Sequence, residues 1–219
     1  MRKLLFIINP ISGGINKTGL RSSISHACEK ANLDYTFFET TGEDDKQHIK
    51  EKINAYAPAD VIACGGDGTV NMVAELLLGH TVRLGIIPLG SANGLAEELC
   101  ISEDLEEALE IIVEGAAKDI DVLIVNEKYL CLHLSDVGLN AKLVRRFEKN
   151  PGRGKLGYAR HFFETLFKRK PIKYSFQSDN DQFNERAEMV VFANAKKYGT
   201  GAIVNPIGKI DDGVFEVCI

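Results

Sequence analysis

The sequence lacks the cysteine patterns that crosslink small secreted proteins or hold zinc. Its five cysteines are odd in number and scattered, and no two of them form a C-x-x-C pair; they are Cys28, Cys64, Cys100, Cys131 and Cys218. A disulfide framework uses an even set of cysteines, and zinc ribbons and fingers use closely spaced pairs. We therefore expect reduced thiols in a cytoplasmic protein and exclude a cysteine-based zinc site.

Long hydrophobic runs are also missing. The N-terminal segment MRKLLFIINP has only a short apolar run before Asn9 and Pro10, too short for a signal peptide. Nothing elsewhere approaches the roughly 20 apolar residues of a membrane-spanning helix. The chain has 219 residues, 45% of them hydrophobic, and a net charge of −5. This composition is typical of a soluble globular protein and argues against a general nucleic-acid binder.

The first 120 residues alternate between strand-like and helix-like patterns. The strand-like runs are apolar or aromatic and lie at 3–8, 34–39, 60–64 and 84–89. The helical patterns lie at 18–31, 44–56 and 103–114. Buried strands that alternate with helices are typical of a parallel sheet covered by helices. We therefore expect an N-terminal α/β domain over residues 1–125.

The pattern changes near Asp119. Two strand-like segments, 119–126 and 129–136, are separated by Glu127-Lys128, which predicts a hairpin. Later strand patterns lie at 172–178, 187–195 and 213–219, and a helical pattern lies at 155–168. We expect a second, mainly antiparallel, β-sandwich-like domain over residues 126–219. The chain stops within a strand pattern, so we expect either that this domain is incomplete at its C-terminal end or that the natural protein is short.

Residues 60–77, DVIACGGDGTVNMVAELL, read as a buried strand, a glycine-rich turn and a helix. Such a turn exposes backbone N–H groups where the helix dipole adds positive charge, which favours a phosphate. No Gly-Lys-Ser/Thr follows, so this is not a Walker A loop, and Asn71 stands where a dinucleotide fingerprint has its third glycine. The alternative is a structural turn whose glycines adopt positive φ.

Asp67, in the middle of this turn, is unexpected in a phosphate loop. A carboxylate about 4 Å from a phosphate charge costs about 4 kcal/mol at an effective dielectric constant of about 20. The cost disappears if Mg²⁺ lies between the two charges, or if the carboxylate addresses a hydroxyl group. Either arrangement belongs to phosphoryl transfer, where metal and positioning supply most of the catalysis. Asp67 therefore indicates a kinase.

Two further turns follow predicted strands. NPISGG lies at 9–14, with Lys17 just beyond, and PLGSANGLA lies at 88–96, where Ser91 or Asn93 would cap the next helix. Each alone reads equally well as an ordinary turn. The carboxyl ends of parallel strands open a crevice at one sheet edge, so three such turns together indicate a binding site.

The elements NPISGG, GGDGTVN and LGIIPLGSANGLA, in this order, resemble the diacylglycerol kinase catalytic domain family, which includes bacterial lipid kinases and the sphingosine and ceramide kinases. GGDGT is shared with NAD kinases and phosphofructokinases, whereas PLGSAN is more specific to the lipid kinases. The segments DIDVLIVN, DVGLNAKLV, LGYARHFFETL and DDGVFEV also resemble blocks of the family. The likeness covers essentially the whole chain.

The resemblance implies that ATP binds at the GGDGT loop, in a fold of two domains, and that a lipid hydroxyl accepts the γ-phosphoryl group. Asp67 would be the catalytic residue. Carried over by position, the nucleotide-binding residues would be Asn9, Thr40, Gly65, Gly66, Asp67, Gly68, Thr69, Asn71, Gly90, Ser91 and Asn93. A structural Mg²⁺, found in several bacterial members, would be held by Asp212 and the backbone carbonyls of Lys209 and Val214. The alternative for 211–213 is a plain hairpin turn.

The sequence departs from the family at two places. Bacterial diacylglycerol kinases usually have Asn-Asp-Phe-Ala where this chain has Asn93-Gly94-Leu95-Ala96, a form closer to sphingosine kinases. The resemblance thus leaves the acceptor open between diacylglycerol and a related lipid such as a sphingoid base. The family's Asp-Gly-Glu motif, whose glutamate is the proposed general base, lies beyond Ile219. Without this glutamate, one expectation is a chain that binds nucleotide but catalyses poorly. In the other, Asp67 substitutes as the base, a role proposed for the equivalent aspartate in some relatives.

Residues 142–173 are strongly basic, with eleven Lys or Arg against Glu148 and Glu164. Within this block, LGYARHFFETLF places several aromatic side chains near one helical face. Basic residues near an anionic membrane contribute about 1 kcal/mol each, so we expect the block to dock transiently on such a surface. In the alternative, the aromatic side chains are core and the charges form a solvated rim. No groove-reading motif supports nucleic-acid binding.

These observations predict an ATP- and Mg²⁺-dependent lipid kinase that is cytoplasmic and peripherally associated with membranes. The expected partners are a lipid substrate, an anionic membrane surface and a second copy in a homodimer, without nucleic acid. One alternative is an NAD kinase-like enzyme, against which GSANGLA and the basic block count. The other is a non-catalytic nucleotide- or lipid-binding protein.

Overall fold

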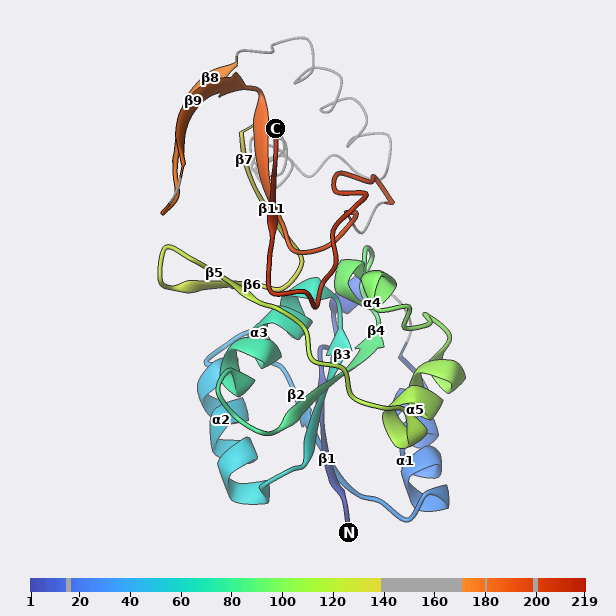
Figure 1. Ribbon diagram of the computed structural model, residues 1–219. Coiled ribbons are helices and arrows are strands. Elements are labelled where there is room, and N and C mark those ends of the chain that lie inside the picture. The colour runs from blue at the N-terminus through green and yellow to red at the C-terminus, as the bar shows by residue number, and fades with distance from the viewer. Residues whose placement is uncertain (15–16, 139–170, 180, 199–200) are drawn as a thin grey trace. The chain divides into compact units, whose positions relative to one another are not determined.

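The computed structural model describes residues 1–14, 17–138, 171–179, 181–198 and 201–219 (Figure 1). They form two compact units. Unit 1 comprises Met1–Leu132 and Lys197–Ala202, and unit 2 comprises His133–Lys196 and Ile203–Ile219. The predicted helix at 155–168 and nearly all of the basic block 142–173 lie outside the described residues.

Unit 1 is built on a parallel sheet with the strand order β2-β1-β3-β4. Its strands are β1 (Lys3–Ile8), β2 (Asp34–Glu39), β3 (Asp60–Gly65) and β4 (Arg83–Pro88). Its helices are α1 (Leu20–Lys30), α2 (Asp45–Tyr56), α3 (Asp67–Leu77), α4 (Gly94–Glu98) and α5 (Leu105–Glu114), with a 3-10 turn, η1 (Ser12–Gly14), after β1. The predicted parallel α/β fold is confirmed.

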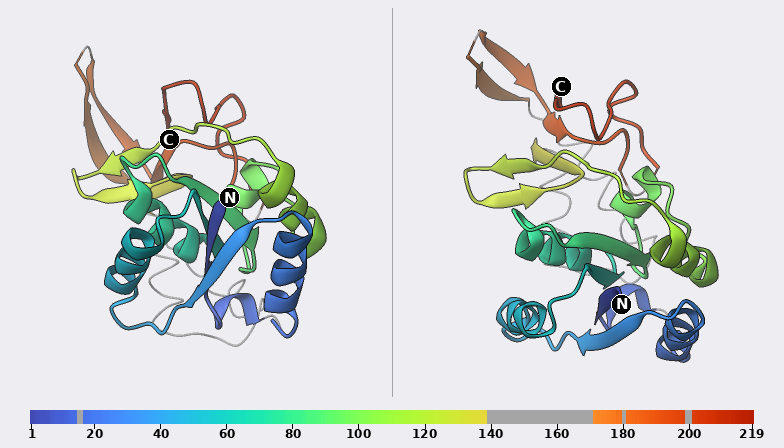
Figure 2. Two further views of the ribbon diagram at one scale, coloured as in Figure 1. Left: turned by 90° about the horizontal axis from the view of Figure 1, so that it is seen from below. Right: turned by 60° about the horizontal axis from the view of Figure 1, so that its bottom comes forward.

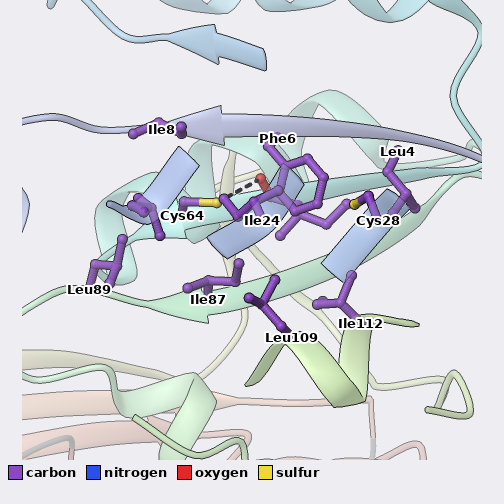
Figure 3. Close-up of a cluster of buried hydrophobic side chains, with 12 residues drawn as sticks. Leu4, Phe6, Ile8, Ile24, Cys28, Cys64, Ile87, Leu89, Leu109 and Ile112 are labelled. Atoms are coloured by element: carbon purple, nitrogen blue, oxygen red, sulfur yellow. Dashed lines mark hydrogen bonds between the residues drawn. The ribbon is translucent and has the colours of Figure 1, made fainter. Parts of the chain in front are cut away.

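Alternate residues of the strands face opposite helical layers. On one face, Leu4, Phe6 and Ile8 of β1 join residues of α1 and α5 in a buried cluster (Figure 3). Leu5 and Ile7 point to the other face and are equally buried. Figures 1 and 2 show α1 and α5 on one side of the sheet and α2 and α3 on the other. Both faces are covered, which explains why β1 is a continuous apolar run rather than an alternating one.

A buried carboxylate ties together the amino ends of the strands. Asp60, which is 4% exposed, accepts hydrogen bonds from Arg2 and Arg83. Arg2 also donates to the carbonyl oxygens of Ile112 and Val113 at the end of α5. Pairing and hydrogen bonds make a buried charge tolerable. This ionic cluster lies at the sheet edge opposite the predicted ligand-binding turns.

The hairpin predicted at Glu127-Lys128 joins β5 (Leu123–Val125) to β6 (Tyr129–Cys131). Asn126 and Glu127 have φ angles of 54° and 56°, and Lys128 N–H donates to Val125 O. Two consecutive left-handed residues form a type I′ turn, which matches the twist of antiparallel strands. The single strand expected over 129–136 is wrong. The chain pairs with β5 as far as Cys131, and then with a different sheet as β7 (Leu134–Gly138).

Unit 2 contains antiparallel strands only, among its described residues. β7, β10 (Met189–Ala193) and β11 (Glu216–Cys218) form a sheet with β10 in the centre. β8 (Ile172–Gln177) and β9 (Gln182–Ala187) form a separate hairpin. The predicted antiparallel character of the second region is confirmed. No described helix is both long and apolar enough to cross a membrane.

Candidate functional site

A cavity of about 330 Å³ opens where β1, β3 and β4 end. Its lining comes from the three turns that follow these strands: Asn9, Ser12, Gly13, Gly66, Asp67, Gly68, Thr69, Gly90, Ser91 and Ala92. The three turns therefore meet at one sheet edge, as the sequence predicts. A cavity of this size is suited to a small ligand.

The N-terminus of α3 forms one wall of the cavity. Gly66 is the N-cap and provides no side-chain cap, and its carbonyl accepts hydrogen bonds from the N–H groups of Thr69 and Val70 at 2.9 and 3.1 Å. The first N–H groups of a helix have no partner within the helix. Together with the helix dipole, they favour an anionic group such as a phosphate.

Glycines allow the turns to approach one another. A Cβ atom on Gly90 would lie 2.4 Å from Gly66 Cα. Gly13 has a φ of +62°, and a Cβ atom there would lie 2.2 Å from Leu89 O. A side chain at either position would push the turns apart, so these glycines are needed for the shape of the cavity.

Hydrogen bonds hold the turn after β1 against α3. Asn9 donates from Nδ2 to Thr69 Oγ1 over 3.1 Å, and its Oδ1 accepts from the N–H of Ile11. Lys17 donates from Nζ to Ser12 O at 2.7 Å and to Pro10 O at 3.1 Å. The amide of Asn9 thus joins two walls of the cavity, and the ammonium group of Lys17 brings positive charge to the first turn.

Asp67 is exposed, and its Oδ1 accepts a hydrogen bond from Leu95 N–H at 3.3 Å. Because Leu95 lies in the first turn of α4, the carboxylate caps that helix from a different segment. The expectation that Ser91 or Asn93 caps it is wrong: Asn93 occupies the N-cap position without a side-chain cap hydrogen bond, because its amide binds Gly90 instead. Among the described residues Asp67 Oδ2 has no hydrogen-bond partner, which leaves it free to address a hydroxyl group or a metal ion.

Most of the predicted nucleotide-binding residues line the cavity: Asn9, Gly66, Asp67, Gly68, Thr69, Gly90 and Ser91. Gly65, Thr40, Asn71 and Asn93 do not. Gly65 is buried at the end of β3, and Thr40 follows the edge strand β2, where its N–H donates to Ile8 O. Asn71 lies a turn further along α3.

Sequence reasoning missed Ser12, Gly13 and Ala92 as individual lining residues. All three belong to the turn motifs NPISGG and PLGSAN, so the signal for them was present. A motif identifies a turn, but the side of the turn that faces the cavity depends on how the neighbouring backbones pack.

The thiol that precedes the glycine-rich turn is not a candidate nucleophile. Cys64 is completely buried, and its Sγ donates to Ile62 O (Figure 3). Burial raises the pKa of this thiol, so it stays protonated.

The predicted magnesium ligands Lys209, Asp212 and Val214 lie in unit 2 and are exposed. Asp212 Oδ1 accepts from Val214 N–H at 3.3 Å across Gly213, whose φ is 78°. This is the pattern of an Asx turn, so a plain turn accounts for it. One carboxylate and two carbonyl oxygens are also the hard ligands that Mg²⁺ prefers, so the donor set fits the ion. Within the described residues, no group of three or more His, Cys, Asp and Glu side chains could hold a metal.

Comparison with known proteins gives matches over both units. Residues 3–125 match the model of the diacylglycerol kinase catalytic domain, and residues 135–219 match that of the YegS C-terminal NAD kinase beta sandwich-like domain. A probable lipid kinase YegS-like of Cronobacter sakazakii is 30% identical over 73% of this chain. A probable lipid kinase YegS of Salmonella arizonae is 27% identical over 82% of it.

The fold is also similar to solved structures. A crystal structure of a diacylglycerol kinase from Bacillus anthracis covers 99% of this chain with a TM-score of 0.77 at 24% identity. At this identity the likeness establishes the fold alone. The chain spans 55% and 62% of the lengths of the two curated relatives and 72% of that solved chain.

Proposed function

Because this chain belongs to the diacylglycerol kinase catalytic domain family, we propose that it is an ATP-dependent lipid kinase. It transfers the γ-phosphoryl group of ATP to a hydroxyl group of diacylglycerol or of a related lipid such as a sphingoid base. The observation that carries the proposal is the cavity, in which the uncapped N-terminus of α3 meets the carboxylate of Asp67. The names of the relatives, lipid kinase and diacylglycerol kinase, support the class of acceptor.

The residues of the cavity have distinct roles in this reaction. The N–H groups at the start of α3 bind phosphate oxygens, and Thr69 is held in place by Asn9. Mg²⁺, when bound, neutralises charge on the transferred phosphoryl group. Asp67 Oδ2 addresses the acceptor hydroxyl or the metal ion, while Oδ1 remains on Leu95 N–H.

Phosphoryl transfer forms one bond to the γ-phosphorus and breaks another. The lipid oxygen forms a bond to the γ-phosphorus, and the bond from that phosphorus to the bridging β–γ oxygen breaks, which releases ADP. The proton of the hydroxyl group leaves to a base, and Asp67 is the carboxylate that we propose for this task.

The remaining predicted ligands lie outside the lining of the cavity. Thr40, Gly65, Asn71 and Asn93 would support nucleotide binding from around the cavity rather than from its lining. Lys209, Asp212 and Val214 would hold a structural Mg²⁺ away from the reacting atoms, which a chelator titration followed by thermal unfolding would test.

Transfer of ³²P from [γ-³²P]ATP tests the function. The chain is incubated with Mg²⁺ and mixed micelles of diacylglycerol, monoacylglycerol, sphingosine or ceramide, with NAD in a parallel reaction. A labelled lipid that disappears in Asp67→Asn would support the proposal and identify the acceptor. Labelled NADP would favour an NAD kinase-like enzyme, and ATP binding without transfer to any acceptor would favour a non-catalytic binding protein.

A lipid acceptor requires access to a bilayer, so we propose that the protein works in the cytoplasm at an anionic membrane surface. The charge of residues 142–173 in the sequence supports this. Liposome flotation tests it: equal recovery with neutral and anionic vesicles would contradict docking.

The predicted homodimer is tested by light scattering on the purified chain.

A further inference from the structure

The third wall of the cavity is the turn after β4, which contributes Gly90, Ser91 and Ala92. Asn93 holds this wall in place. Its Oδ1 accepts from Gly90 N–H at 2.8 Å, and its Nδ2 donates to Gly90 O at 3.1 Å. The side chain is buried, at 5% exposure, on a backbone with φ 52°. One amide therefore fixes both backbone groups of Gly90, the glycine whose backbone touches that of Gly66.

The Asn93 amide can make both hydrogen bonds to Gly90 in one orientation only. Rotation of the Asn93 side chain by 180° about its last bond would place the NH₂ group against Gly90 N–H and the oxygen against Gly90 O. Two donors or two acceptors would then face each other, and both hydrogen bonds would be lost. The wall therefore depends on whatever sets the orientation of this amide.

Glu103 provides that orientation. Its Oε1 accepts a second hydrogen bond from Asn93 Nδ2, at 2.9 Å. An ionised carboxylate accepts hydrogen bonds and donates none, so it selects the rotamer with the NH₂ group towards it and the oxygen towards Gly90 N–H. Ten residues separate the two in sequence, and no motif connects them.

Glu103 is exposed, and its backbone directly precedes the N-cap of α5. The next residue, Asp104, is the N-cap of α5, and its carboxylate accepts from the N–H groups of Glu106 and Glu107 at 2.9 and 3.1 Å. α5 in turn contributes Leu109 and Ile112 to the buried cluster against the sheet. The backbone that carries the Glu103 carboxylate is thus joined to the capped and packed start of a helix.

We infer that Glu103 is a positioning residue of the cavity: through Asn93 it holds Gly90, Ser91 and Ala92 in the conformation that lets Gly90 lie against Gly66. It touches no ligand itself. The consequence for ATP rests on the proposed function, whereas the consequence for the conformation of the wall does not.

Three substitutions of Glu103 test whether the hydrogen-bond acceptor, and not merely a side chain of this size, is needed to orient the Asn93 amide. Glu103→Gln keeps an acceptor oxygen, Glu103→Ala removes it, and Glu103→Lys presents a donor that favours the rotated amide. Glu110→Lys is the matched control, because Glu110 is an exposed carboxylate in the middle of α5.

Hydrogen exchange of the Gly90 amide is measured by ¹H–¹⁵N NMR on the full chain without nucleotide, and the Kd for ATP by calorimetry. We expect Glu103→Gln and Glu110→Lys to resemble the wild type. In Glu103→Ala we expect exchange at Gly90 to accelerate and the Kd for ATP to rise, each about tenfold, as for loss of a hydrogen bond to a charged group. The changes should be larger in Glu103→Lys, with little change in the unfolding temperature.

Unchanged exchange at Gly90 in Glu103→Lys would overturn the inference. Accelerated exchange with an unchanged Kd would overturn the link from the wall to the nucleotide. If the wild-type chain binds no ATP while Gly90 still responds to Glu103→Lys, the positioning role stands and the proposed function fails.

Discussion

The carboxylate of Asp67 lies 3.3 Å from the backbone nitrogen of Leu95 and accepts its hydrogen bond. The side chain that the sequence singles out for chemistry therefore also joins α3 to α4. Its Oδ1 makes this structural hydrogen bond, and its Oδ2 is available to a ligand. A substitution at this position consequently mixes two effects unless the replacement keeps the acceptor.

Asp67→Asn and Asp67→Ala separate the two effects. Asn keeps an oxygen that can accept from Leu95 N–H but carries no charge, whereas Ala keeps neither. We expect both to lower the rate of phosphoryl transfer about 100-fold or more, as for loss of a catalytic carboxylate. Only Ala should also lower the free energy of unfolding, by about 1 kcal/mol. Rate assays and urea unfolding measure these, and full activity in Asp67→Asn would rule out a charged role.

Gly90→Ala tests the contact between two walls of the cavity. The new Cβ atom would lie 2.4 Å from Gly66 Cα, so the turns must separate. We expect a destabilisation of about 1–3 kcal/mol, as for an overpacked site, with loss of ATP binding. Gly68→Ala is the control for stability, because nothing lies within 4 Å of a Cβ atom there. Equal unfolding free energies for the two variants would contradict the close approach.

Asp60→Ala tests the ionic cluster at the other sheet edge. Removal of this carboxylate leaves Arg2 and Arg83 without their shared partner. Both arginines are partly exposed, so we expect a loss of about 2–3 kcal/mol rather than the full cost of an isolated buried charge. Glu39→Ala breaks the exposed pair with Arg21 and should cost at most about 1 kcal/mol. Chemical unfolding of both variants gives the comparison, and a similar small loss for each would contradict it.

Cys100 follows α4 with a φ of 57°, a left-handed conformation that residues with a side chain rarely adopt. Cys100→Gly relieves this strain, and we expect the free energy of unfolding to rise by about 1 kcal/mol or slightly less, because glycine also loses more chain entropy. Cys100→Ala keeps the Cβ atom and should leave stability nearly unchanged. Thermal unfolding distinguishes the two, and equal stabilities would show that the strain is absorbed elsewhere.

Local patterns in the sequence were sufficient to predict the sheet of unit 1 and the edge at which the three turns meet. The runs LLFII in β1 and VIAC in β3 are apolar without interruption because both faces of the sheet are covered. The glycines of the three turns marked where the strands end. The hairpin after Val125 was also predictable, since its signal lies within neighbouring residues.

Other features depended on partners distant in the sequence. The segment 129–136 looks like one strand, but β6 pairs in unit 1 and β7 in unit 2. Asn93 has the sequence context of a helix cap, yet its amide binds Gly90 and Glu103. The start of α4 is capped instead by Asp67, which lies 28 residues before Leu95 in the sequence.

The sequence by itself determined the class of fold, the order of its strands and helices in the chain and the turns that form the cavity, because periodicity and glycine placement act over a few residues. Only the tertiary structure decided which atoms of those turns face the cavity and which polar side chains hold them. Hydrogen-bond orientation and backbone approach are properties of the packed molecule. Asn93 and Glu103 illustrate this: the amide and the carboxylate can be read from the sequence, but their contact depends on how the chain before α4 packs against the chain before α5.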